Sequence, residues 1–223
     1  MRFDRFEVLT FDCYGTLIDW EKGILSVLKP IFSKHAVNVS DEEVLKTYAE
    51  IEAKIEKGPF IKYKKVLQKV MQEFCNRYNL NAELDCLVNS LKDWPPFPDT
   101  VPTLKAFKKR YKLAIISNID KELFSFTQKR LLIKFDWIIL SEEIKAYKPS
   151  LINFEYALKK INIPKERILH IAQSLYHDIN PAKKLGLNTV LVKRRGFGAT
   201  LPVLGHADIE VPDLKTLLSI MKV

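Results

Sequence analysis

The sequence predicts an α/β protein in which a doubly wound, Rossmann-like parallel sheet carries an inserted all-helical cap domain. After residue 98, helical segments alternate regularly with short apolar runs, which implies right-handed crossovers and a mainly parallel sheet. From residue 20 to about residue 91, apolar residues recur at helical spacing and no segment has a convincing strand pattern. We therefore expect a core formed by residues 1–19 and 98–223, and a helical cap formed by residues 20–97.

The first strand is expected close to the N-terminus. A short apolar run over residues 6–9, continued by Phe11, stops at a polar cluster over residues 12–16. This order places polar side chains at the carboxyl end of a buried strand, which is where open α/β sheets bind ligands.

The predicted cap begins at Trp20 and contains consecutive, short-linked helices. Ser40, followed by three acidic residues, is typical of a helix start, and Gly58 with Pro59 separates two helices. A proline-rich stretch over residues 94–98 marks the return to the core. Because the insertion leaves and re-enters at one sheet edge, we expect it to cover a cleft there. One helical stripe, predicted to be bundle core, consists of Phe60, Tyr63, Leu67, Val70, Phe74 and Tyr78.

The second part of the core is predicted from its alternating rhythm. Each helix is followed by a short apolar run of strand length. The expected order is a helix over 100–109, a strand over 113–116, a helix from 121, a strand over 137–140, a helix from 151, a strand over 168–171, a helix from 180 and a strand over 189–192.

Composition excludes several classes of protein. With 47% hydrophobic and 28% charged residues, the chain is typical of a folded domain, and no apolar run approaches the roughly 20 residues of a membrane helix. The three cysteines show no CxxC spacing, which favours a reducing cytoplasm. Residues 20–97 contain 12 basic and 11 acidic residues, so most of the formal net charge of +9 comes from the rest of the chain. There the basic residues are spread over helix faces. We therefore expect neither a nucleic-acid nor a membrane partner.

Polar residues at four strand ends are the candidates for chemistry. They are Asp12, Ser117 with Asn118, Lys148 and Asp178, and a parallel sheet would bring them to one edge. An aspartate in a tight glycine-containing turn, flanked by a lysine, stays ionised and can attack an electrophilic carbon or phosphorus. Any one of these residues alone would more often be structural, for example as a helix cap.

Together these segments resemble the four motifs of the haloacid dehalogenase superfamily. Residues 12–17 are similar to its first motif, 115–118 to its second, 147–149 to its third and 174–178 to its fourth. The ordered set, with a helical insertion between the first two motifs, spans nearly the whole chain.

The resemblance is strongest to the 2-haloacid dehalogenases. Most phosphatases of the superfamily have a second, proton-donating aspartate two residues after the nucleophile, whereas this chain has Tyr14 there. Carried over, Asp12 is the nucleophile that displaces halide, Thr16 is a supporting hydroxyl, and Ser117 with Asn118 holds the substrate carboxylate. The resemblance further implies that Lys148 neutralises Asp12, and that Asp178 anchors Lys148 or helps to activate water, with no cofactor.

The predicted pocket includes departures from that family. Gln173 and Leu175 stand where the dehalogenases typically have serine and asparagine, and Phe154 stands where they have tyrosine. No arginine in the first cap helices matches their halide-binding one; the nearby cations are Lys54, Lys57 and Lys62. The residues expected to contact substrate or line its pocket are Tyr14, Trp20, Phe60, Trp94, Gln173, Ser174 and His177.

Two alternatives to a dehalogenase stay open at this point. A Mg²⁺-dependent phosphatase would hold its metal with Asp12, the Tyr14 carbonyl and Asp178, although Gln173 occupies the place of a further acid. A catalytically weak homologue would keep the pocket only for binding. In each case the resemblance implies a small anionic substrate, and it allows a homodimer, since related dehalogenases are often dimeric.

Overall fold

The computed structural model describes residues 2–194, 196 and 203–223. Its centre is a six-stranded sheet in the order β3-β2-β1-β4-β5-β6, in which every pair of neighbours is parallel. The strands are β1 (Val8–Phe11), β2 (Lys112–Ser117), β3 (Trp137–Leu140), β4 (Ile168–Ala172), β5 (Asn188–Val192) and β6 (Ile209–Val211). This is the doubly wound arrangement that the sequence predicts, and the direction of winding reverses at β1 and β4.

The sixth strand was not expected from the sequence. β6 has only three residues, Ile-Glu-Val, and it pairs with β5 at the sheet edge. A segment so short shows too little alternation to be separated from a loop.

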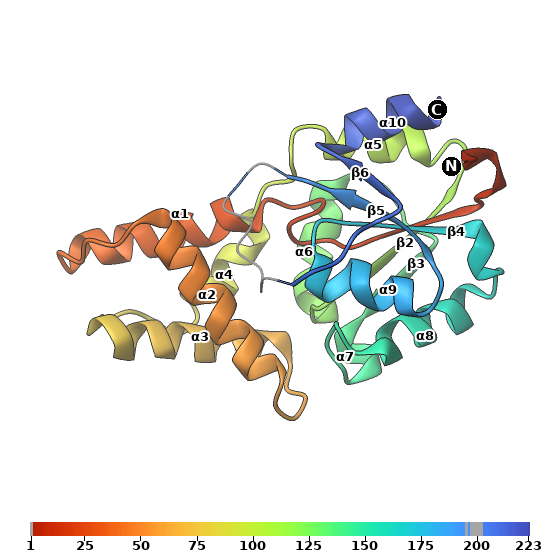
Figure 1. The fold of residues 1–223 in the computed structure, drawn as a ribbon. Coiled ribbons are helices and arrows are strands. Elements are labelled where there is room, and N and C mark those ends of the chain that lie inside the picture. Colours follow the sequence, from red (N-terminus) through yellow and green to blue (C-terminus); the bar gives the residue numbers. More distant parts are fainter. Residues whose placement is uncertain (1, 195, 197–202) are drawn as a thin grey trace.

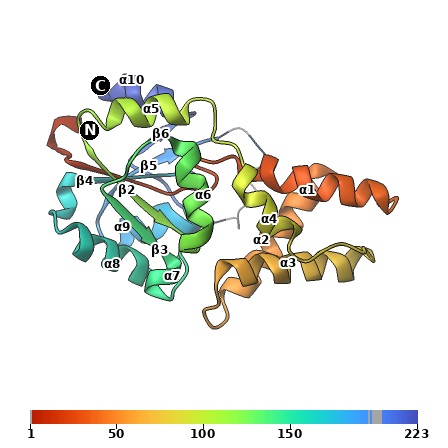
Figure 2. The same ribbon diagram turned by 180° about the vertical axis from the view of Figure 1, so that it is seen from behind.

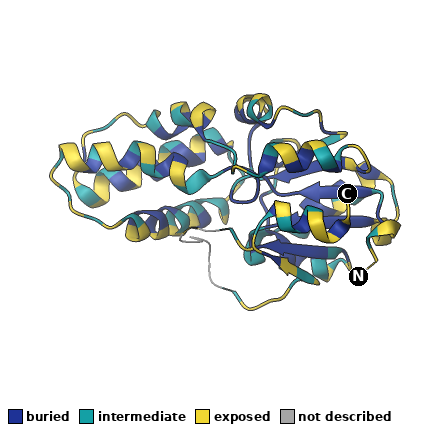
Figure 3. Cartoon of the chain, turned by 90° about the horizontal axis from the view of Figure 1, so that it is seen from above, coloured by how far each residue is buried: buried dark blue, intermediate teal, exposed yellow. Residues whose placement is uncertain are grey.

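Alternating side chains of the strands divide the core into two hydrophobic layers. In β1, Val8 packs into one cluster while Leu9 and Phe11 pack into the other. The Leu9 layer lies beneath α5 (Thr100–Phe107), α6 (Lys121–Leu131) and α10 (Leu214–Met221). The Val8 layer lies beneath α8 (Leu151–Ile161) and α9 (Asn180–Lys184). Figure 2 shows α5 beside α10, and Figure 3 shows a buried sheet between helices that are exposed on their outer faces.

Shorter helical turns complete the core. They are η1 (Phe3–Arg5), α7 (Ser141–Ile144), η3 (Lys165–Arg167) and the π-helical turn η4 (Leu175–Ile179). The last of these follows β4 directly and carries Asp178. Single π-turns are often found at functional sites.

The segment between β1 and β2 forms a helical lobe beside the sheet (Figure 1). It contains α1 (Trp20–Lys34), α2 (Asp41–Glu56), α3 (Tyr63–Tyr78), α4 (Cys86–Ser90) and η2 (Leu91–Asp93). Ser40 caps α2 as expected, since its hydroxyl accepts a hydrogen bond from the Glu43 N–H at 3.2 Å. None of the helices in the described ranges is both long and apolar enough to cross a membrane.

The two connections between lobe and core run side by side. The Asp19 N–H donates to the Pro95 carbonyl at 2.8 Å, and the Phe97 N–H donates to the Leu17 carbonyl at 3.0 Å. The lobe therefore leaves and rejoins the core at one place. The division into a core of residues 1–19 and 98–223 and a cap of residues 20–97 stays a prediction.

Candidate active site

Asp12 lies one residue beyond β1, where its carboxylate is held on both sides. Lys148 Nζ donates to Oδ1 at 2.8 Å, and Thr16 Oγ1 donates to Oδ2 at 2.6 Å. Its backbone N–H donates to the Ile171 carbonyl of β4 at 3.1 Å, which extends the β1–β4 pairing to the carboxyl edge. The side chain is 9% exposed and lines a cavity, so the carboxylate is buried but reachable from one side.

The turn after Asp12 explains how Thr16 reaches back to it. Gly15 has a φ of 95°, a backbone conformation that strongly favours glycine. A Cβ at this position would lie 3.2 Å from both the Gln173 and the Trp20 side chains. The turn also brings Thr16 Oγ1 within 2.9 Å of the Gln173 N–H, from which it accepts a hydrogen bond. Thr16 is thus fixed under Asp12 rather than exposed to substrate.

Lys148 joins the strand ends. Its Nζ donates to Asp12, to Asp178 Oδ1 at 2.6 Å and to the Ile116 carbonyl at 3.0 Å, so all three of its protons are used. Burial opposes its charge, but the two carboxylates outweigh burial and raise the pKa of Lys148 above its usual value. Asn118 positions the backbone of Lys148: its Oδ1 accepts from the Lys148 N–H at 2.7 Å and its Nδ2 donates to the Lys148 carbonyl at 3.0 Å.

Asp178 is anchored by a histidine that the sequence analysis did not place in the site. His170 Nε2 lies 3.1 Å from Asp178 Oδ1, and its Nδ1 lies 2.9 Å from Thr10 Oγ1. Because an ionised carboxylate only accepts, Nε2 donates to Asp178. The edge of the His170 ring meets the ring of Phe154, with centroids 5.2 Å apart. Although burial opposes ionisation, Lys148 and His170 lower the pKa of Asp178.

For Asp12, the candidate nucleophile, burial outweighs the favourable contacts, and the net shift of the pKa is upward. Burial raises the pKa of Asp12, and the nearby charge of Asp178 acts in the same direction. Lys148 and Thr16 favour the ionised form of Asp12 but do not fully compensate.

A cavity of about 80 Å³ lies between these residues and the helical lobe. Since a water molecule needs about 10–15 Å³ by the same measure, this is room for a small molecule. The core contributes strand-end residues and the lobe contributes aromatic and acidic ones. The lining consists of Asp12, Tyr14, Trp20, Tyr48, Ala49, Glu52, Ala53, Glu56, Tyr63, Trp94, Ser117, Asn118, Lys148, Gln173, Ser174, His177 and Asp178.

Phe60 lies outside this lining, unlike the other side chains expected to contact substrate. It precedes α3, and its ring packs on that of Tyr147 with centroids 5.2 Å apart, while Lys145 Nζ lies 5.4 Å from its centroid. Phe60 therefore supports the residue next to Lys148 instead of facing the cavity. The three cations considered for a halide site, Lys54, Lys57 and Lys62, are exposed and also lie outside the lining.

Tyr14 forms one wall of the cavity. Its hydroxyl is 2.7 Å from Thr127 Oγ1, and its ring meets that of Trp94 in a T-shaped contact at 5.7 Å. Burial raises the pKa of Tyr14 well above its usual value of 10. A phenol with such a pKa is a poor proton donor at neutral pH.

Two glutamates of α2 complete the lining, and the sequence analysis missed both. The Tyr48 and Tyr63 hydroxyls donate to Glu52 Oε1 at 3.0 and 2.5 Å. Glu56 Oε2 accepts a longer hydrogen bond, 3.3 Å, from Asn118 Nδ2. Burial raises the pKa of Glu52, and burial together with the Glu52 charge raises that of Glu56 well above its usual value. The signal in the sequence was the spacing of residues 48, 52 and 56, which puts them on one helix face.

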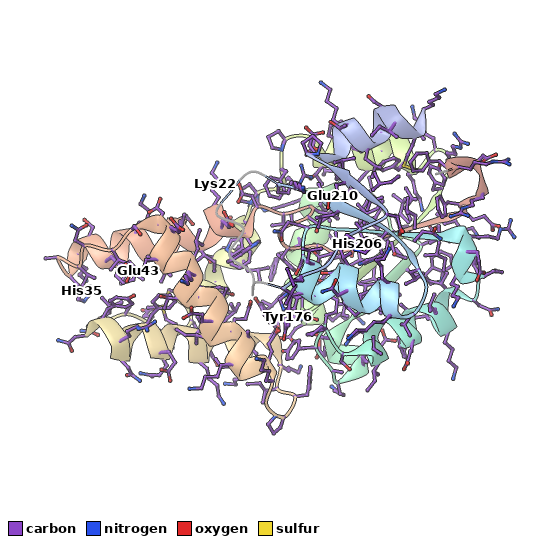
Figure 4. All side chains as sticks on the ribbon, viewed as in Figure 1. Lys22, His35, Glu43, Tyr176, His206 and Glu210 are labelled. Carbon is purple, nitrogen blue, oxygen red and sulfur yellow. The ribbon has the colours of Figure 1, made fainter. Side chains whose placement is uncertain are left out.

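The remaining histidines do not form a metal site. His177 lines the cavity, and burial lowers its pKa to about 4, so it is neutral at pH 7. Figure 4 shows His35 at the far end of the helical lobe and His206 on the core side. Across the ranges that the structure describes, no three His, Cys, Asp or Glu side chains are grouped so as to hold a metal ion.

Comparison with known proteins places this geometry in a family. The model of the haloacid dehalogenase-like hydrolases matches residues 9–192. The chain belongs to this family. The hydrolase is 24% identical to haloacetate dehalogenase H-2 of Moraxella sp. (strain B), with 98% of this chain and 99% of that protein aligned. It is 31% identical to a glyceraldehyde 3-phosphate phosphatase of Methanocaldococcus jannaschii, with 57% of each chain aligned.

Solved structures show the same fold over nearly the whole hydrolase. An L-2-haloacid dehalogenase from Xanthobacter autotrophicus, with chloropropionic acid covalently bound, has a TM-score of 0.81 and 16% identity; 97% of this chain and 98% of that chain are covered. A putative hydrolase of the family from Bacillus subtilis, bound to magnesium, has a TM-score of 0.79 and 19% identity; 98% of this chain and 100% of that chain are covered.

Proposed function

We propose that this hydrolase releases halide from a small 2-haloalkanoic acid through an ester formed on Asp12. The observation that carries the proposal is the environment of Asp12: a buried carboxylate next to the Lys148 ammonium, with Tyr14 where a phosphatase of the family would have a second aspartate. The alignment with haloacetate dehalogenase H-2 over nearly the full length of both chains supports it.

In the first step, an Asp12 carboxylate oxygen attacks carbon 2 of the substrate. A new C–O bond forms, the carbon–halogen bond breaks, and the halide leaves with its electron pair, so no proton donor is needed. Ser117 and Asn118, at the end of β2, hold the substrate carboxylate, and the aromatic walls of the cavity exclude water from the attacking oxygen.

In the second step, water attacks the carbonyl carbon of the Asp12 ester. The bond from that carbon to the substrate oxygen breaks, and the proton taken from the water passes to this oxygen, which releases the 2-hydroxy acid. The carboxyl group left on Asp12 loses the second proton of the water to solvent and is again a carboxylate. Asp178 has a second oxygen, Oδ2, that is buried and has no hydrogen-bond partner among the described atoms, so it can accept the proton of this water. Lys148 stabilises the charge that returns to Asp12.

A Mg²⁺-dependent phosphatase is the second candidate, favoured by the partial match to a phosphatase and by the unpartnered Asp178 Oδ2. Lys148 and Thr16 already occupy Asp12, and Lys148 with His170 already occupies Asp178 Oδ1. Mg²⁺ favours octahedral sites built from oxygen ligands, and Asp178 Oδ2 is a single free carboxylate oxygen. The residues therefore fit the metal poorly, and we propose turnover without a cofactor.

The proposal extends to the setting of the reaction. We propose a cytoplasmic hydrolase with a small anionic substrate, without nucleic-acid or membrane partners, in which residues 20–97 act as a cap over the cavity and the chain can form a homodimer.

Halide release tests the reaction. Purified protein is incubated with 2-chloro, 2-bromo and fluoro carboxylates in the presence of EDTA, with Asp12→Asn as the control. We expect release that EDTA leaves unchanged and that the substitution lowers by about 10⁴-fold or more. In a single turnover in heavy-oxygen water, the label should enter Asp12 first.

Other outcomes would each point elsewhere. Phosphate release that depends on Mg²⁺, with no halide release, would assign the chain to the phosphatases. If the protein releases neither halide nor phosphate but binds the same carboxylates, it would be assigned to the non-catalytic binding proteins.

A further inference from the structure

The lobe side of the cavity carries two acidic side chains, which the binding of a simple haloacid does not require. Glu52 and Glu56 lie one helical turn apart on α2 and both line the cavity. Tyr48 and Tyr63 direct their hydroxyls to Glu52 and hold it in place. Among the described residues, Asn118 alone donates a hydrogen bond to the Glu56 carboxylate, at 3.3 Å. Glu56 can therefore accept further hydrogen bonds from a ligand.

Aromatic rings surround these carboxylates. Trp20 and Tyr48 face each other with centroids 5.4 Å apart, and Tyr14 and Trp94 meet at 5.7 Å; all four line the cavity with Tyr63. Electron-rich ring faces attract cations within about 6 Å, and aromatic walls are the usual surroundings of bound quaternary ammonium groups. The aromatic rings and the carboxylates therefore both favour a cationic ligand.

The balance of charge in the cavity points the same way. Among the described residues of the lining, Lys148 is the one side chain that is cationic at neutral pH, and its protons are already taken by Asp12, Asp178 and a carbonyl. The charge of Lys148 favours the ionised form of Glu56, and no second lysine or arginine among the described residues of the lining lies beside the two glutamates. A second anionic group of a substrate would further oppose the ionisation of these glutamates, whereas a positive group bound there would favour their ionised form and be attracted to it.

We propose that the substrate is zwitterionic: a 2-haloalkanoate whose far end carries an ammonium group, which binds among Glu52, Glu56 and the aromatic rings of the lobe. This rests on the proposed function for its reacting end. The carboxylate and carbon 2 lie at Ser117, Asn118 and Asp12, and the ammonium lies across the cavity at α2.

Matched substrates test this inference. The cationic one is 2-chloro-5-(trimethylammonio)pentanoate, whose quaternary nitrogen cannot cyclise onto carbon 2. The neutral isostere is 2-chloro-6,6-dimethylheptanoate, which replaces nitrogen by carbon, and a trihydroxy analogue of similar length tests whether the glutamates bind hydroxyl groups instead. We expect kcat/KM to favour the cationic substrate over its isostere by about tenfold or more, the ratio that about 1.4 kcal/mol gives.

Variants of α2 locate the preference. The double substitution E52Q/E56Q removes two carboxyl groups from the cavity, and Glu50→Gln removes one from the exposed side of the same helix as a matched control. The cationic preference should fall toward unity in the double variant and persist in the control. An equal rate for the cationic substrate and its isostere, a preference for the trihydroxy analogue, or a preference that E52Q/E56Q leaves intact would overturn the inference.

Binding without turnover separates this inference from the proposed reaction. The probe is 5-(trimethylammonio)pentanoate, which has no halogen, titrated against the tryptophan fluorescence in the wild type and in E52Q/E56Q; Trp20 and Trp94 line the cavity, whereas Trp137 on β3 does not. Binding that needs the glutamates, without halide release from any substrate, would support the cation site and contradict the proposed reaction. Halide release from simple haloacids, without binding of the probe, would support the reaction and contradict the cation site.

Discussion

The two ends of the cavity are built in different ways. At the sheet edge, Asp12, Lys148 and Asp178 come from rigid strand ends, and hydrogen bonds use nearly all of their polar atoms. At the lobe, Glu52 and Glu56 come from a helix, burial raises the pKa of both, and Lys148 is the one cation among the described residues of the lining. The contrast is consistent with our proposals that the sheet edge carries the reaction and that the lobe selects the substrate.

After Asp12→Asn, the largest effect should follow from removing the cation at the sheet edge. Lys148→Met leaves Asp12 and Asp178 buried without their shared partner, so kcat/KM should fall by about 10²–10³-fold. The free energy of unfolding should fall by about 3 kcal/mol, since a buried charge then loses its partner. Steady-state kinetics and denaturant titration measure both, with the exposed Lys145→Met as control. Near-normal activity would show that the pair is only structural.

The pH dependence of the reaction should report Asp12. Only its ionised form attacks, so activity should be lost as pH falls through its pKa, and burial places that pKa above the ordinary aspartate value of about 3.9. Thr16→Val removes a donor that favours the ionised form, so the acid limb of kcat/KM should move up by about one pH unit, while Thr16→Ser should leave it in place. A limb that does not move in Thr16→Val would assign it to another group.

A smaller effect is expected at the lobe, and it should have the opposite sign. The folded-state pKa of Glu56 is raised, so its ionisation costs stability as pH rises from its usual value near 4.5 toward the folded-state value. Glu56→Gln should therefore raise the free energy of unfolding at pH 8 by on the order of 1 kcal/mol and change it little at pH 4. Denaturant titration at both pH values checks this. A loss of stability at pH 8 would mean that Glu56 is well paired.

The smallest effect should come from Tyr14→Phe. The phenol hydroxyl is hydrogen-bonded to Thr127 and its pKa is raised by burial, so it takes no part in proton transfer. Halide release should fall by less than about threefold, within the range of a lost neutral hydrogen bond. A decrease of a hundredfold with a change in the pH profile would instead make Tyr14 an acid catalyst.

Much of the fold was predictable because it depends on local periodicity. Five of the strands and the helical nature of residues 20–90 follow from apolar spacing, whereas β6 is too short to show any. The convergence of Asp12, Ser117, Asn118, Lys148 and Asp178 was also predictable, since carboxyl ends of parallel strands meet at one edge. His170 was missed because a histidine inside an apolar strand gives no sign of which side chain it meets.

By itself, the sequence determined the order of the elements and which residues end the strands, because backbone periodicity and parallel pairing are local rules. Only the tertiary structure decided what the helical lobe brings over that edge. Phe60 turns to Tyr147, while Glu52 and Glu56 face Asp12 across the cavity. The direction in which a helix presents its side chains is set by how it packs on distant segments, and that packing is a property of the folded chain in three dimensions.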